Sequence, residues 1–154
     1  MKTALLGLAS LLTVTSVSAF DQVYLDRLLE TRQCNFCNLS EADLSGQDFS
    51  GIDISEANLK GTNFSNTKLV GVWFTHSKLH GANLEGADLS TSLLDYAIFD
   101  GANLTGANLS NTQLVFTDFT GANLTNANLE GAKIRGVTYC NTTMPDGTVN
   151  NSGC

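Results

Sequence analysis

A five-residue repeat constrains the fold of this chain more than any other feature. From Leu39 to Ile134, every fifth residue is Leu, Phe or Ile, over twenty consecutive positions. We call each of these the central residue of its five. The residue two places earlier, the small residue, is usually Ala, Ser or Thr, and Asn or Asp usually stands between the two. The stretches GANLTGANLS (101–110) and GANLTNANLE (121–130) show the pattern in its most regular form.

Neither a helix nor a long strand accounts for a period of five. A helix would spread the central residues around its whole circumference, and the many Asn, Asp and Gly residues oppose helix formation. A strand would send successive central residues to alternate faces. A chain that turns a corner every five residues points all of them inward, and four such sides close a square coil. The sequence therefore predicts a solenoid whose coils stack through strand-like hydrogen bonds.

The repeat also resembles a known family. The segments ANLEGADLS (82–90) and GANLTGANLS (101–110) are similar to the A(D/N)LXX motif of the pentapeptide repeat proteins. This resemblance implies an all-β solenoid, namely a right-handed quadrilateral β-helix, which agrees with the square coil inferred from the period. About five coils, spaced roughly 4.8 Å apart, would form a rod about 24 Å long.

The first residues of the chain differ in kind from the repeat. Lys2 precedes a short apolar run, ALLGLASLLTV (4–14), and the small-residue stretch VSA (17–19) follows it. This order is typical of a secretory signal peptide. We therefore expect a signal peptide over residues 1–19, with cleavage after Ala19.

The remaining chain divides into three segments. Residues 20–36 read as a helical cap, residues 37–139 as the β-helix, and residues 140–154 as a disulfide-bonded capping tail, because the repeat is lost there and MPDG (144–147) signals a turn. The helical cap would lay one apolar face over the first coil, formed by Tyr24, Leu25, Leu28 and Leu29.

The charge of the chain limits its partners. Without residues 1–19, it carries 7 Lys and Arg residues against 15 Asp and Glu residues, a formal net charge of −8. An acidic surface disfavours nucleic acid and anionic membranes. We expect no nucleic-acid partner and, after signal cleavage, no membrane partner.

The four cysteines lie only at the two ends of the chain. An exported chain with an even number of cysteines is expected to form disulfides. Cys37 begins the expected β-helix and Cys140 ends it, so they lie about 24 Å apart, whereas a disulfide needs Cα atoms within about 7 Å. We therefore expect Cys140 to pair with Cys154 and Cys34 to pair with Cys37. The C-x-x-C spacing of the second pair also leaves open a redox-active pair or a metal site.

We expect no catalytic site, no cofactor and no metal site. The spacing of His76 and His80 imitates a helical metal pair, but a corner every five residues sends these side chains to different faces, and no third ligand is evident. The sequence contains neither a phosphate-binding glycine loop nor a nucleophile motif. A convex rod also lacks the deep concave pocket in which catalysis usually occurs.

Aligning the repeat in steps of twenty residues gathers large apolar side chains at one edge of the rod. They form the candidate interface, which consists of Trp73, Leu93, Tyr96, Ile98, Val115 and Phe116. Exposed aromatic clusters of this kind mark interfaces with a partner or with a second copy. The alternatives are that the tail or another local segment covers them, or that a relaxed repeat places bulky residues there without functional consequence. An opposite face carries the column Asn63, Asn83, Asn103 and Asn123, which predicts an amide ladder.

Three functions are compatible with these features. The first is a non-catalytic structural or protein-interaction module, exported to the periplasm or thylakoid lumen as in the cyanobacterial proteins that the layout resembles. The second is a thiol-redox protein that uses Cys34 and Cys37. The third is a DNA mimic that binds topoisomerase, as in the quinolone-resistance branch of the family. The signal peptide opposes this last function, and so does the spread of acidic residues over several faces (Asp43, Asp48, Asp53, Asp88 and Asp118).

Overall fold

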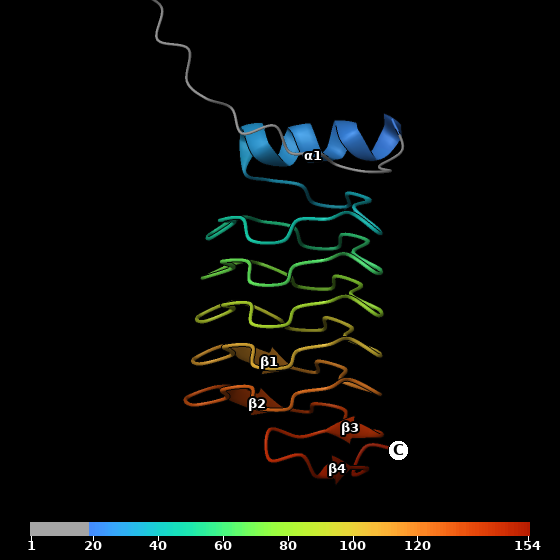
Figure 1. The fold of residues 1–154 in the computed structure, drawn as a ribbon, viewed down its shortest axis with the longest axis vertical. Coiled ribbons are helices and arrows are strands. Elements are labelled where there is room, and N and C mark those ends of the chain that lie inside the picture. The colour runs from blue at the N-terminus through green and yellow to red at the C-terminus, as the bar shows by residue number, and fades with distance from the viewer. Residues whose placement is uncertain (1–18) are drawn as a thin grey trace, which may run out of the picture.

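A computed structural model describes residues 19–154 as a stack of coils with a helix across its N-terminal end (Figure 1). Helix α1 spans Ala19–Thr31. The named strands are short and lie in the C-terminal half: β1 (Gln113–Val115), β2 (Lys133–Arg135), β3 (Thr142–Thr143) and β4 (Val149–Asn150). The expected signal peptide lies outside the described residues, apart from Ala19, the first residue of α1.

Each coil takes twenty residues. Parallel bridges join Asn38 to Asn58, Asn58 to Lys78 and Lys78 to Ile98, and β1 pairs in parallel with β2 in the same register. The bridges recur every five residues along the chain, so a coil has four sides, as the period of five predicts. They also run past the expected bounds of 37–139, because Gln33 pairs with Asp53 and Asn123 pairs with Thr143.

The corners explain why Gly and Asn recur in the repeat. The Ala42 N–H donates to the carbonyl of Leu39, and Glu41, two residues after that central Leu, has a φ of 61°. This is a turn with a positive φ at its third position, where glycine is at ease and Asn is the best-tolerated alternative. We call this position the corner residue. The same left-handed backbone is found at the corner glycines, such as Gly101 and Gly121.

The core consists of the central and small residues of successive coils. Central residues such as Leu59, Leu84 and Phe99 have no exposed surface, and Phe99 stacks on Phe119 with ring centroids 5.2 Å apart. Where the small residue is Ser or Thr, its buried hydroxyl usually donates to a backbone carbonyl of the previous coil, as Ser77 does to Ile54 (2.7 Å), and Thr112 instead donates to Leu109 of its own coil (2.7 Å). A buried hydroxyl is therefore tolerated because it is hydrogen-bonded.

Amide ladders link the coils on the polar face. The Asn63 amide donates to the Asp43 carboxylate (3.0 Å), Asn83 donates to Asn63 (3.3 Å), and Asn103 donates to Asn83 (3.2 Å). The predicted ladder is thus confirmed from Asn63 to Asn103. Each of these side chains also accepts an N–H from the residue two places later, as Asn103 does from Thr105, and so holds its own turn.

Helix α1 packs on the first coil with a narrower face than expected. Leu25 and Leu28 are buried, and Tyr24 packs partly against the core. Leu29 was expected on this face, but the structure leaves it 49% exposed. The reason is angular, since Leu29 lies about 100° around the helix from Leu28. No helix among the described residues is long and apolar enough to cross a membrane.

The C-terminal tail closes only part of the other end. Strand β4 turns back and pairs antiparallel with β3, covering one region below the last coil (Figure 1). Ile134, the central residue of β2, remains 50% exposed, whereas the central residues Leu94 and Leu114 above it on the same side are fully buried.

Candidate interaction surface

One side of the coil stack carries most of the candidate interface. We call it the aromatic side; its central residues are Cys34, Ile54, Phe74, Leu94, Leu114 and Ile134. Its outward residues just before the central ones form a bridged column of Gln33, Asp53, Trp73, Leu93, Gln113 and Lys133. The corner that follows carries Phe36, Glu56, His76, Tyr96, Phe116 and Gly136, all with a positive φ. The backbone register therefore sets these side chains one above another.

The corner side chains form a stack of rings. His76 stacks on Tyr96 with centroids 4.7 Å apart, and Tyr96 stacks on Phe116 at 5.3 Å. The Phe116 ring in turn lies over Gly136, where an added Cβ would come within 2.6 Å of it. The stack continues over three coils because the coil spacing matches the distance at which aromatic rings pack. His76 was not among the expected interface residues, although the twenty-residue register places it in the same corner column as Tyr96 and Phe116.

The rings are accessible to a partner. Trp73 is 51% exposed, Tyr96 is 46% exposed and Phe116 is 48% exposed, while Leu93 and Val115 are half-buried beside them. These five residues lie on one side and its corner. We call them, together with His76, the aromatic edge.

Ile98 lies apart from the other candidate residues. It bridges Lys78 and Asp118 on the next side, past the corner residue Tyr96. The structure therefore places five of the six candidate residues together and the sixth around the corner.

A hollow of about 340 Å³ adjoins Trp73 at the N-terminal end of the aromatic side. Its lining includes Thr31 at the end of α1, Arg32, Asp53, Gly51 and Gly71. The two glycines leave space at the corner before this side, and the Arg32 guanidinium donates to the carbonyl of Ser50 beside it. The hollow was not predicted, because it depends on where α1 ends relative to the first coils.

The carboxylate in this hollow is held in its charged form. Burial by itself would raise the pKa of Asp53, but hydrogen bonds from the Asn35 side chain and from Ser55 outweigh it and keep the pKa below its ordinary value. Asp53 therefore adds a negative charge beside Trp73 at neutral pH.

The cysteines lie in two pairs at the ends of the stack. Cys34 is bonded to Cys37 with Cα atoms 5.3 Å apart, and Cys140 is bonded to Cys154 at 4.7 Å. The first pair forms a turn in which the Cys37 N–H donates to the Cys34 carbonyl. Cys34 thereby takes a central position and Cys37 a small position, one side earlier than the expected start of the repeat.

Comparison with known proteins identifies the family. The model of the pentapeptide repeats matches residues 37–75, 74–111 and 102–138, which together span about two thirds of the chain. The chain belongs to the pentapeptide repeat family. Proteins of this family fold as right-handed quadrilateral β-helices and are generally non-catalytic. No curated protein sequence matches the chain.

Two solved structures are similar to this pentapeptide repeat protein. Rfr23, a pentapeptide repeat protein from the cyanobacterium Cyanothece 51142, is 29% identical with a TM-score of 0.78; the similarity covers 80% of this chain and 98% of that one. A pentapeptide repeat protein from the thylakoid lumen of Arabidopsis thaliana is 31% identical with a TM-score of 0.64, over 66% of this chain and 71% of that one.

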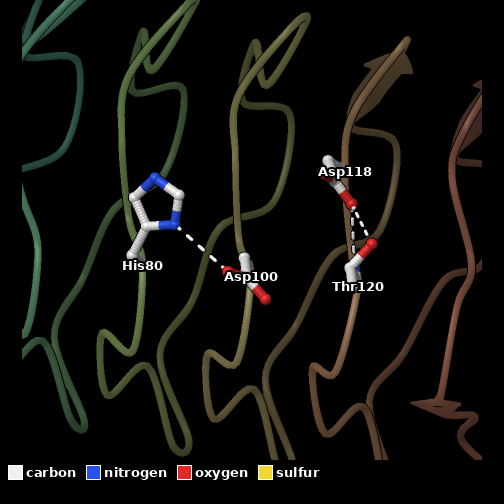
Figure 2. Close-up of polar contacts among 4 residues, drawn as sticks. All are labelled: His80, Asp100, Asp118 and Thr120. Carbon is white, nitrogen blue, oxygen red and sulfur yellow. Dashed lines mark hydrogen bonds and ion pairs between the residues drawn. The ribbon is translucent and has the colours of Figure 1, made fainter.

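The two histidines of this pentapeptide repeat protein serve different contacts. His76 belongs to the ring stack, whereas His80 lies on the next side with its Nδ1 3.4 Å from a carboxylate oxygen of Asp100 (Figure 2). Asp118 is close by in the following coil, but it accepts hydrogen bonds from the N–H and hydroxyl of Thr120 (Figure 2). Within residues 19–154, no group of three His, Cys, Asp or Glu residues is arranged to hold a metal ion.

The acidic residues considered for a DNA mimic do not share a face. The bridges place Asp48 and Asp88 in one column, with Lys68 between them. Asp43, Asp53 and Asp118 lie in three other columns. This arrangement lacks the continuous carboxylate face that a mimic of the phosphate backbone requires.

Proposed function

We propose that this pentapeptide repeat protein is a non-catalytic interaction module of an exported compartment and that it binds protein through the aromatic edge. The observation that carries the proposal is the stack of His76, Tyr96 and Phe116, which is ordered by the backbone and exposed beside Trp73. Ordering side chains before binding lowers the entropic cost of association, and aromatic residues dominate interface energetics.

The ends of the rod support a structural role for both disulfides. We propose that the rod has about five coils, that α1 caps the first and that the bonded tail protects part of the last. Unpaired coil edges favour aggregation, and covering them prevents it. The disulfides and the signal-like residues 1–19 favour export, and the lumenal relative from Arabidopsis thaliana is consistent with a thylakoid lumen or periplasm.

A thiol-redox function is the second candidate, and burial weighs against it. Cys34 and Cys37 have no exposed surface, and Tyr24 of α1 places its carbonyl 3.2 Å from the Cys34 sulfur. Reactive cysteines occupy partly exposed environments, so that a partner thiol can reach the sulfur. A structural bridge in this position should resist mild reduction, which mass analysis after titration with a thiol–disulfide buffer would measure.

The proposed function is tested by affinity capture from the exported fraction of the source cells. The bait is the purified exported protein, and the test variant is Trp73→Asp with Phe116→Asp. The matched control is Asn66→Asp with Asn126→Asp, which adds the same charge at exposed corner positions on the diagonally opposite edge. Asp is tolerated at positive φ, so the corner changes should preserve the fold.

We expect the control variant to capture the same proteins, a second copy of the chain included, as the unchanged bait. The test variant should lose them while its circular dichroism spectrum and unfolding midpoint stay the same. Equal capture by all three baits would refute binding through the aromatic edge.

A further inference from the structure

The charges on the aromatic side have opposite signs at its two ends. Asp53 and Glu56 lie at the N-terminal end, and Lys133 and Arg135 of β2 lie at the C-terminal end. Glu56, Lys133 and Arg135 are exposed, and the rings of the aromatic edge lie between the two ends. The middle of the side therefore carries mainly rings and apolar side chains, with Asp95 among them, while one end is acidic and the other basic.

The bridged column begins at Gln33, and its two charged members, Asp53 and Lys133, lie at equal distances from Leu93. Asp53 and Trp73 precede Leu93 by two coils and one coil, and Gln113 and Lys133 follow it by the same steps. Consider a two-fold axis that passes through Leu93 and runs along the strand direction, perpendicular to the rod. This axis places a second copy face to face with the first and reverses the order of its coils. Each column of one copy then lies opposite the same column of the other. Asp53 of one copy then faces Lys133 of the other, and Glu56 comes close to Arg135.

The same operation pairs the rings. In the corner column, Tyr96 faces Tyr96 and His76 faces Phe116 of the second copy. An isologous interface requires such self-complementarity, in which each residue meets a partner that meets it in turn. A parallel arrangement, with the axis along the rod, is also isologous, but it brings like charges together because Asp53 lies close to Glu56 of the second copy.

We propose that the aromatic side binds a second copy of this chain as an antiparallel, side-by-side dimer. The inference rests on the proposed function of the aromatic edge and names its partner. Opposite charges at the two ends fix the orientation, while the rings and the half-buried Leu93 and Val115 supply apolar area.

The size of this contact makes the dimer weak. From Asp53 to Lys133 the column spans four coil spacings, about 19 Å. A single side of the rod buries well below the roughly 800 Å² per partner of a stable complex. We therefore expect a dissociation constant between about 10 μM and about 1 mM, which depends on the local concentration of the protein.

One residue opposes the dimer and sharpens the test. Asp95 is half-buried between Leu93 and Tyr96, where its carboxylate accepts the Val115 N–H (3.0 Å), so the two-fold axis brings two Asp95 residues close together. Asn at this position keeps the acceptor and removes the charge. Asp95→Asn should therefore tighten the dimer roughly fivefold, the effect of removing one like-charge contact in a solvated site.

The decisive experiment is sedimentation velocity of the purified exported protein over roughly 10 μM to 1 mM at about 0.15 M salt, where net charge repulsion is screened beyond about 8 Å. Two charge-reversal variants are compared, Lys133→Glu with Arg135→Glu and Asp53→Lys with Glu56→Lys. Each variant alone presents like charges at both ends of the dimer and should associate at least tenfold more weakly. An equimolar mixture restores every opposite-charge contact and should form a heterodimer.

Recovery in the mixture excludes misfolding as the cause of the loss. Lys also occupies the equivalent outward position at Lys68 and Lys78, so the fold accepts Asp53→Lys. Lys60→Glu, an exposed change on another side, should leave association unchanged. A monomeric wild type over the whole range, or variants that associate as the wild type does, would overturn the dimer, and so would a mixture that stays monomeric.

The two proposals fail separately. A monomer that still captures another protein through Trp73 and Phe116 would leave the interaction module standing and remove the second copy as its partner. A monomer that captures nothing through these residues would remove both.

Discussion

The corner residue is the position at which this backbone is most demanding. Glycine satisfies a positive φ without strain, but several corners carry other residues, and Thr91 has a φ of 60°. A left-handed conformation costs a residue with a Cβ about 1–2 kcal/mol, and Thr is β-branched. Strain at such corners is acceptable where the side chain makes a contact, as in the stack of His76, Tyr96 and Phe116.

Replacing Thr91 by glycine should stabilise the protein. The relief of left-handed strain exceeds the 0.4–1 kcal/mol that glycine loses through the entropy of the unfolded chain, so we expect a gain of about 0.5–1 kcal/mol in the free energy of unfolding. The Thr91 N–H bond to the Ser110 carbonyl is unaffected. Urea unfolding measures the change.

Thr75→Gly is the matched control, because Thr75 precedes the corner residue His76 in its turn and has no positive φ. This substitution should lower the midpoint. If both glycine variants lowered it equally, corner strain would not explain the preference for glycine in the repeat.

Where Asp or Asn precedes the central residue, its side chain holds the turn and links neighbouring coils. Asp43 accepts hydrogen bonds from the Ser45 hydroxyl (2.7 Å), the Ser45 N–H (3.2 Å) and the Asn63 amide (3.0 Å). The Ser45 contacts, chiefly, hold the pKa of Asp43 below its ordinary value of 3.8. The same column continues with Asn63, Asn83 and Asn103, which offer the same acceptor without a charge.

Asp43→Asn should flatten the acid dependence of stability. Because the pKa of Asp43 is lowered in the folded state, its stabilising effect is complete above the pKa of the unfolded chain, near 4, and is lost as the pH falls through the folded value. The Asn variant has no proton to take up. Urea midpoints from pH 7 to pH 2 should therefore fall less for the variant, and parallel curves for the two proteins would exclude Asp43 as a contributor.

Helix α1 packs on the first coil mainly through the buried side chains of Leu25 and Leu28. Leu28 is 1% exposed, whereas its neighbour Leu29 is half exposed. Leu28→Ala should lower the free energy of unfolding by about 2–5 kcal/mol, the usual range for a buried leucine. Leu29→Ala is the control and should cost less than about 1 kcal/mol. Equal effects in thermal unfolding would indicate that α1 does not pack on the coil through Leu28.

At the scale of the whole molecule, the regular part of the rod is the part that sequence predicts. The spacing of Leu, Phe and Ile reveals the sides of the coils, because each side buries its central residue and the same five-residue pattern therefore recurs along the rod. Cys34 occupies a central position, but it is not Leu, Phe or Ile, so the repeat pattern does not reveal it. The expected start at Cys37 therefore comes one side too late. The end at Thr143 was missed for the same reason, because its side lacks the consensus.

The sequence predicts only those parts of the candidate surface that the twenty-residue register stacks one above another. Trp73, Leu93, Tyr96, Val115 and Phe116 follow from counting along the chain, because the backbone itself stacks them. The register alone did not separate Ile98 from this surface. Ile98 lies two residues past the corner residue Tyr96, so its side chain belongs to the next side. The hollow beside Trp73 depends on the meeting of Arg32, Gly51 and the end of α1, a contact between unlike elements that no repeat encodes.

The two disulfides should differ in their effect on the stability of the rod. In the chain-entropy description, a bond stabilises by restricting the unfolded chain, more so when it closes a longer loop. The Cys140–Cys154 bond joins residues 14 positions apart, and the Cys34–Cys37 bond joins residues 3 apart. Cys140→Ser with Cys154→Ser should therefore lower the free energy of unfolding by about 3 kcal/mol, and Cys34→Ser with Cys37→Ser by about 2 kcal/mol from loop closure alone.

Burial adds a second effect at the N-terminal pair. Cys34 and Cys37 occupy inward positions beneath α1, so two serine hydroxyls there must be buried in the core. Ala in place of both cysteines avoids the buried hydroxyls, although it also removes two buried sulfur atoms from the core. Unfolding in urea should therefore rank the alanine pair at Cys34 and Cys37 as milder than the serine pair. If the alanine and serine pairs were equally unstable, the sulfurs would not be part of the packed core, and loop closure alone would explain the cost.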